Sequence, residues 1–314
     1  MHVTLYLPLL LPVAAAFTAR PLAERLEPRL ATWLLTGSAL VLAAGSSLVL
    51  GLLAVAGLVR IPLVARLADL SLPVIRRSQP PAWWVAVVAA LMLSAAVTAV
   101  ARTLWRRTRA FLASADEAAC LPGRRRVVVL DDPAADAFAM PGLPGRIVVS
   151  TGMLDALDDE ERQVLLAHER AHLRGHHYLF TNAAQIAAAA NPVLRPLAAA
   201  VTYTVERWAD ERAAVATGNR RRVAVAVGKA ALAARRTRTV RPVSQMVLGA
   251  LGRHRRPRAA GGPVPRRVAA LLAPTPRNRP LPLAGSGLLL AATVLCAHGA
   301  YHDLHHLLRL ARLG

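Results

Sequence analysis

The residues from Asp158 to His177 read DDEERQVLLAHERAHLRGHH, and the predicted fold is built around this stretch. Asp158 is a suitable helix N-cap, and Glu161, three residues later, completes a capping box. Apolar residues follow at Val164, Leu165 and Leu166. The pattern predicts a helix that begins near Asp158 and buries one face.

This helix contains His168, Glu169 and His172 in the pattern H-E-x-x-H. Two histidines four residues apart share one helix face, so both can bind one Zn²⁺ ion. Glu169 then lies beside the metal-bound water and is the candidate general base. The alternative is a chance occurrence with two solvent-facing histidines.

A second acidic motif follows at Glu206–Asp210, read ERWAD. Glu206 and Asp210 share a helix face, so Glu206 is the candidate third zinc ligand and Asp210 the carboxylate that orients a ligand histidine, His168. The alternative is an acidic face in contact with solvent.

A histidine close behind H-E-x-x-H is the competing third ligand. In the metzincin pattern H-E-x-x-H-x-x-G-x-x-H, Gly175 occupies the glycine position, but Tyr178 occupies the position of the last histidine. His176 and His177 miss that position by two and one. We therefore interpret His176, His177, Tyr178 and Tyr203 as candidates for contacts to the substrate or transition state.

Four segments together resemble the BlaR/MecR family of membrane metallopeptidases, and a related pattern occurs in the HtpX/Ste24 family. They are Ala137–Ala139, Pro141–Leu154, Leu165–His172 and Glu206–Asp210. The resemblance covers roughly residues 127–214. It implies a gluzincin zinc endopeptidase with one Zn²⁺ per chain, which cleaves a cytoplasmic winged-helix repressor of the BlaI/MecI type or itself in signal transduction.

Two other functions remain open. One is a quality-control protease of the HtpX/Ste24 kind, whose members tend to place hydrophobic spans between H-E-x-x-H and the third ligand, a feature that the constraints on Tyr178–Thr204 described below disfavour here. The other is a non-catalytic membrane transducer, although such a scaffold would not require Glu169. In the BlaR/MecR family a penicillin-binding sensor domain often follows the last span, whereas about 14 residues follow Ala300 here, so we do not expect direct β-lactam sensing.

The composition indicates a membrane protein. Of its 314 residues 55% are hydrophobic, the mean hydropathy is +0.39, and only 4% are aromatic, which favours apolar helices. The net charge of +21 comes almost wholly from arginine. The Arg-rich part, residues 219–279, is expected to face solvent or anionic lipid. It lacks aromatic interleaving and any motif for reading bases, so direct nucleic-acid binding is not expected.

Hydropathy predicts four spans, and the arginines that follow the third place the next segment in the cytoplasm. The fold class is therefore a mainly α membrane protein with an inserted α+β gluzincin domain. Both termini are predicted outside the plasma membrane. The spans are Val3–Ala19, Ala31–Val59, Pro81–Ala101 and Leu281–Ala300; residues 1–101 form the three-helix membrane region, 102–280 the cytoplasmic peptidase domain and 301–314 a short external tail.

Two features are predicted inside the inserted domain. The runs Arg126–Leu130 and Arg146–Thr151 favour strands of a small sheet, whose exposed edge could hold an extended substrate. The apolar run Tyr178–Thr204 is broken at Asn191-Pro192. One crossing there would separate Glu206 from His168, and the second half is too short to cross alone. A helical hairpin packed in the domain, or shallow in the interface, satisfies both constraints.

Overall fold

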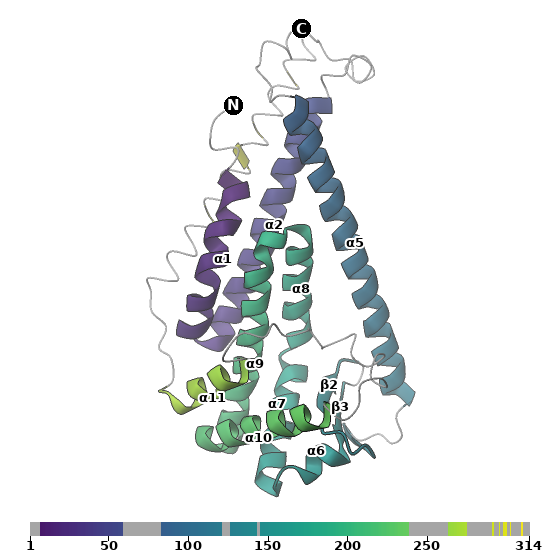
Figure 1. Cartoon of the computed structure of the whole chain (residues 1–314), viewed down its shortest axis with the longest axis vertical. Helices are drawn as coiled ribbons and strands as arrows, with labels where there is room; N and C mark the ends of the chain where they lie inside the picture. The colour runs from purple at the N-terminus through teal and green to yellow at the C-terminus, as the bar shows by residue number, and fades with distance from the viewer. Residues whose placement is uncertain are drawn as a thin grey trace.

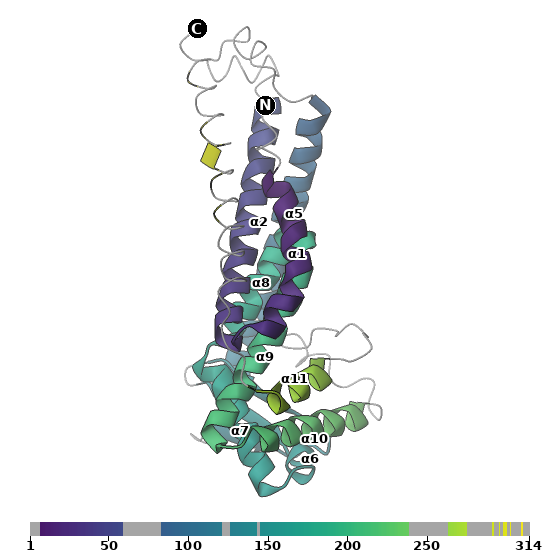
Figure 2. The same ribbon diagram turned by 90° about the vertical axis from the view of Figure 1, so that its left-hand side faces the viewer.

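The computed structural model describes residues 7–58, 83–120, 126–142, 145–238 and 263–274, with isolated positions between 291 and 309. It is mainly helical with one small sheet. Long helices form one end of the molecule, and the sheet with the shorter helices forms the other (Figures 1 and 2). The helices are α1 (Leu7–Arg25), α2 (Pro28–Leu58), α5 (Trp83–Cys120), α6 (Thr151–Asp155), α7 (Asp159–Arg174), α8 (His177–Ala190), α9 (Arg195–Thr217), α10 (Arg220–Arg238) and α11 (Pro263–Leu272).

Two described helices, α2 and α5, are long and apolar enough to cross a membrane. The core helix of a soluble protein can pass the same test, but such a helix is mostly buried. Only 17% of the apolar window of α5 is buried, and its exposed side chains include Val87, Leu91 and Val97. This exposure suggests contact with lipid. The predicted first span overlaps α1, which does not meet the criterion, and the predicted fourth span falls almost wholly outside the described residues.

The sheet has three strands in the order β1-β3-β2. The predicted strands correspond to β1 (Val127–Leu130) and β3 (Arg146–Ser150), which pair in parallel. The sequence did not predict β2 (Ala137–Met140), which pairs antiparallel with β3 and contacts α7. Ile147, Val148 and Val149 of the central strand are almost fully buried, because both faces of β3 are covered.

The segment after α7 folds into the predicted helical hairpin, α8 and α9, with Asn191 at its tip. The hairpin does not pack inside the domain. It extends along α1, α2 and α5 (Figure 1), and its core is shared with α1 and α2. Asn191 donates from Nδ2 to Oγ of Ser46 over 3.2 Å, and Oγ of Thr32 donates to Oγ of Thr204 over 3.0 Å. Small residues such as Ala184, Ala187 and Ala198 permit this close packing.

The lower half of α9 continues into the domain and crosses α7. The helices α10 and α11 pack on each other, and both contact α9 (Figure 2). Helix α7 is therefore held between β2, α9 and α10. This arrangement brings residues from three distant parts of the chain to one place.

Candidate metal centre

The helix α7 begins as its sequence predicts. The side chain of Asp158 accepts from the backbone N–H of Glu161 over 2.8 Å, and Glu161 accepts in return from the N–H of Asp158 over 3.1 Å. Lys229 of α10 lies 2.5 Å from the buried Glu161 carboxylate, and Val164 is 1% exposed. The capping box and this packing fix the helix that carries His168, Glu169 and His172.

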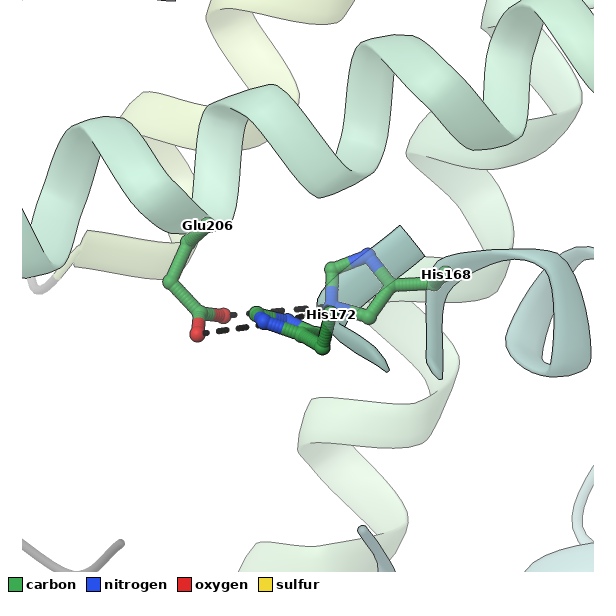
Figure 3. A group of neighbouring side chains, drawn as sticks. All are labelled: His168, His172 and Glu206. Atoms are coloured by element: carbon green, nitrogen blue, oxygen red, sulfur yellow. Dashed lines mark hydrogen bonds and ion pairs between the residues drawn. The ribbon is translucent and has the colours of Figure 1, made fainter. Parts of the chain in front are cut away.

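Three side chains converge between α7 and α9 (Figure 3). Nε2 of His168 and Nε2 of His172 are 3.1 Å apart, and the Glu206 oxygens lie 3.7 Å from His172 Nε2 and 4.0 Å from His168 Nε2. Ligands about 2.1 Å from one tetrahedral Zn²⁺ would be about 3.4 Å apart. Two imidazoles and one carboxylate are also a donor set that Zn²⁺ accepts at catalytic sites. The residues therefore fit Zn²⁺, and this is the cluster able to hold a metal in the described part of the chain.

Asp210 lies behind His168, on the side away from the other candidate ligands. Its Oδ1 is 3.0 Å from Nδ1 of His168, and its side chain is 2% exposed. Burial lowers the pKa of His168, but the neighbouring Asp210 outweighs this effect and raises it. The contact leaves Nε2 of His168 directed at the candidate metal position, as the sequence-based hypothesis for Asp210 requires.

A buried arginine, Arg267 of α11, binds both carboxylates of the site. Its guanidinium donates to both oxygens of Asp210 over 2.6 and 2.7 Å and to Oε2 of Glu206 over 2.6 Å. Burial opposes ionisation of both acids, but Arg267 lowers the pKa of Glu206 to about 2 and holds that of Asp210 far below its ordinary value. The predicted solvent or lipid exposure of the Arg-rich part is thus wrong for Arg267, which is 6% exposed.

Glu169, the candidate general base, lies next to His168 on α7. It is 8% exposed, and the backbone N–H of Ala139 in β2 donates to its carboxyl group. Burial raises the pKa of Glu169 to about 7, with a further increase from the negative charge of Glu206. A carboxyl group with such a pKa can both accept and release a proton near neutral pH.

The four other predicted contact residues have different surroundings. His177 is buried, and its Nδ1 lies 3.0 Å from Nδ1 of His172, while His176 is exposed. Tyr178 stacks on Phe111 of α5, with ring centroids 5.9 Å apart. Tyr203 is buried, and Cζ of the Arg266 guanidinium lies 4.6 Å from the centroid of its ring. None of the four belongs to the ligand cluster of the described residues, so their contacts to a substrate stay predictions.

The remaining residues of ERWAD join the site to the long helices. Arg207, 3% exposed, donates to the backbone carbonyl of Ala23 over 2.6 Å, at the C-terminal end of α1. A cation there satisfies free carbonyls and complements the helix dipole. Trp208 packs on His177, with ring centroids 4.5 Å apart. Neighbouring residues of α9 therefore contact three different parts of the molecule: the candidate metal site, α1 and His177.

The site and the sheet beneath it lie within a region similar to known peptidases. Residues 101–244 match the model of peptidase family M48. The match contains H-E-x-x-H and Glu206–Asp210, supports a metallopeptidase of this family, and ends before α11 and Arg267. It does not assign the BlaR/MecR type. No curated protein and no solved structure gives a significant match to the chain.

Proposed function

We propose that the chain is a membrane-embedded zinc endopeptidase whose zinc ligands are His168, His172 and Glu206. The observation that carries the proposal is the convergence of these three side chains from α7 and α9. Asp210 orients His168, and Arg267 keeps Glu206 and Asp210 ionised. The M48 match of this region supports the same chemistry.

A bound Zn²⁺ would supply Lewis acidity toward a water molecule and the scissile carbonyl. Glu169 takes the proton of the attacking water and delivers it to the leaving amine nitrogen, so the bond broken is C–N and no other reactant is needed. Burial raises the pKa of this carboxyl group to about 7 in the metal-free protein, and the positive charge of a bound Zn²⁺ would lower it and favour the carboxylate that accepts the proton. The N–H of Ala139 holds this carboxyl group in place.

The edge of β2 would hold the peptide substrate. β2 is an edge strand of the sheet, and its Ala139 lies next to Glu169. An extended peptide added along this edge would form backbone hydrogen bonds and pass beside the metal position. Such binding depends mainly on the backbone of the substrate and little on its side chains, and it requires an unfolded substrate segment.

The substrate we propose first is a cytoplasmic regulatory protein, a winged-helix repressor of the BlaI/MecI type, or the chain itself. Its support is the joint spacing of the sequence segments that resemble BlaR/MecR. We do not propose that the chain binds nucleic acid directly. The domain would work on the cytoplasmic side of the plasma membrane, with both termini outside.

A quality-control protease of the HtpX/Ste24 kind is the second candidate, and the position of the hairpin favours it, contrary to the expectation from the sequence. Such members tend to place hydrophobic spans between H-E-x-x-H and the third ligand, and here α8 and α9 extend along α2 in that interval. Its substrates would be misfolded membrane proteins.

Zinc content and proteolysis of the purified full-length protein test the chemistry. We expect about one zinc per wild-type chain, retained zinc without cleavage in Glu169→Gln, and loss of both in Glu206→Ala. The control is Arg170→Gln, which changes an exposed neighbour of the base. Zinc retained in full by Glu206→Ala would refute the third ligand, and equal cleavage by wild type and Glu169→Gln would refute the base.

Co-expression separates the two substrate classes. A candidate winged-helix repressor and an unstable membrane protein are each produced with wild type or with Glu169→Gln. Cleavage of the repressor alone supports the regulatory proposal. Cleavage of the membrane protein alone supports the quality-control function and contradicts the first proposal.

A further inference from the structure

The contact between His172 and His177, behind the candidate metal position, suggests a role for His177. Nε2 of His172 faces the other candidate ligands, whereas its Nδ1 faces His177, with 3.0 Å between the two Nδ1 atoms. A ring nitrogen that binds a metal uses its lone pair, so the proton of a neutral His172 must lie on Nδ1. That proton requires an acceptor, and Nδ1 of His177 is within hydrogen-bonding distance.

We propose that His177 is a positioning residue, whose neutral imidazole accepts the Nδ1 proton of His172 and so fixes the ring and tautomer that direct Nε2 toward the metal. The inference rests on the proposed zinc site. It gives the two ligand histidines different partners, because His168 faces the carboxylate of Asp210 while His172 faces an uncharged ring.

The surroundings of His177 favour this role over simple packing. The side chain is 2% exposed and lies between the rings of His172 and Trp208. When Nδ1 accepts, Nε2 carries the proton, and this buried atom has no hydrogen-bond partner among the described residues. An unpartnered buried donor is unfavourable, so an apolar side chain would serve packing better.

The backbone before α8 is also adapted to this ring. A Cβ atom at Gly175 would lie 2.3 Å from Nε2 of His177, so the glycine leaves the space that the imidazole occupies. His176 has φ 47°, a left-handed conformation that is rare for a residue other than glycine. This residue forms the junction between α7 and α8 and returns His177 toward the last turn of α7.

Asparagine and leucine at position 177 provide the decisive comparison, because they share one branched shape and only asparagine has an acceptor at the position of Nδ1. The full-length protein in detergent is titrated with Zn²⁺ against a chromophoric chelator. We expect His177→Leu to weaken zinc binding about 10- to 100-fold. We expect His177→Asn to remain within a few-fold of wild type, as does the control His176→Asn, which changes the exposed neighbour and tolerates its left-handed backbone.

A second variant tests the position of the ring without removing it. Gly175 has φ −83°, which alanine adopts freely, so Gly175→Ala acts mainly by displacing His177. We expect it to weaken zinc binding like His177→Leu. The Co²⁺ absorption spectrum provides an independent measurement, which should change in His177→Leu and Gly175→Ala and stay unchanged in His177→Asn.

The outcomes distinguish the two levels of the hypothesis. Equal zinc affinity of wild type and His177→Leu overturns the positioning role while the zinc site stands. Equal loss in the leucine and asparagine variants, with a lower thermal midpoint of both metal-free proteins, also overturns it, since the role would then be packing. Failure of wild type to bind zinc overturns the proposed function itself.

Discussion

Arg267 is the residue on which the charge balance of the site depends. It is the buried cation between Glu206 and Asp210, so Arg267→Ala leaves the buried Asp210 carboxylate and the partly exposed Glu206 carboxylate without it. Loss of one partner from a buried ion pair costs about 3–5 kcal/mol. We expect the thermal midpoint of the metal-free protein to fall sharply, and added zinc to restore part of it because the ion supplies positive charge beside Glu206.

Arg266→Ala is the matched control for this prediction. Arg266 is next in sequence, but its side chain is 35% exposed and pairs with Glu24 over 3.1 Å. An exposed pair of this kind contributes at most about 1 kcal/mol. Equal destabilisation by the two substitutions would contradict the role of Arg267. Differential scanning fluorimetry with EDTA and with zinc measures both effects.

Glu169 should make the metal-free protein less stable as the pH rises. Its folded pKa of about 7 exceeds the ordinary glutamate value of 4.5, so between these two pH values the folded state holds a proton that the unfolded state has released. The stability contribution is complete below pH 4.5 and is lost as the pH rises through 7. The full difference corresponds to about 3 kcal/mol.

Glu169→Gln removes this titration. In EDTA we therefore expect the variant to melt at a higher temperature than wild type at pH 8, and the advantage to shrink toward pH 5. Comparing the two proteins at each pH cancels the titration of His172 and His177, whose pKa values are lowered mainly by burial in both proteins. The pKa of His168 is raised in part by the Glu169 charge, so its coupling to Glu169 belongs to the measured difference. A pH-independent difference would show that Glu169 is ionised throughout.

The residues of the site differ in how far the sequence could predict them. His168, Glu169 and His172 follow from helical periodicity, and Glu206 with Asp210 follows from the same spacing rule. Arg267 lies 61 residues beyond Glu206, among many similar arginines, and no local pattern distinguishes it. The contact of His177 with His172 was not predicted, because the left-handed turn at His176, which directs His177 toward His172, has no sequence signal outside glycine and asparagine.

At the scale of elements, the capping box of α7 should influence stability without influencing zinc. Asp158→Ala removes the acceptor for the N–H of Glu161 and should cost about 1 kcal/mol, whereas Asp158→Asn retains an acceptor and should cost less. The ligand His168 lies ten residues further along α7, about 15 Å away. A thermal midpoint lowered in alanine but not asparagine, with unchanged zinc affinity, is the expected result; altered zinc affinity would contradict it.

The elements themselves were predictable where a local rule specifies them. The capped helix, the strands β1 and β3 and the break at Asn191-Pro192 follow from capping, β-rich composition and proline. The strand β2 was missed because four residues, AFAM, carry no alternation that marks a strand. The direction of the hairpin was also missed. A count of apolar residues fixes its length but not its neighbours, which are set by contacts such as Asn191 with Ser46.

At the scale of the whole molecule, the hairpin reaches deep along α2. Thr32 of α2 bonds Thr204 near the domain, and Ser46 bonds Asn191 at the tip. Ser46 lies fourteen positions beyond Thr32, which is about 21 Å along the helix and more than half of a hydrocarbon core about 30 Å thick. If α2 crosses the membrane and enters the hydrocarbon core near Thr32, the tip lies within the bilayer, past its middle.

Cysteine labelling tests both this depth and the predicted topology. In a background with Cys120 and Cys296 replaced by serine, Val193→Cys places a thiol at the hairpin tip and Val215→Cys places one on the domain part of α9. Both valines are exposed in the structure, at 42% and 79%, so the described residues do not shield position 193 and its protection would indicate lipid. With a membrane-impermeant maleimide we expect no labelling of either in intact cells, and labelling of Val215→Cys alone once the membranes are opened. Labelling of Val215→Cys in intact cells would place the domain outside, whereas equal labelling of both in opened membranes would remove the hairpin from the bilayer.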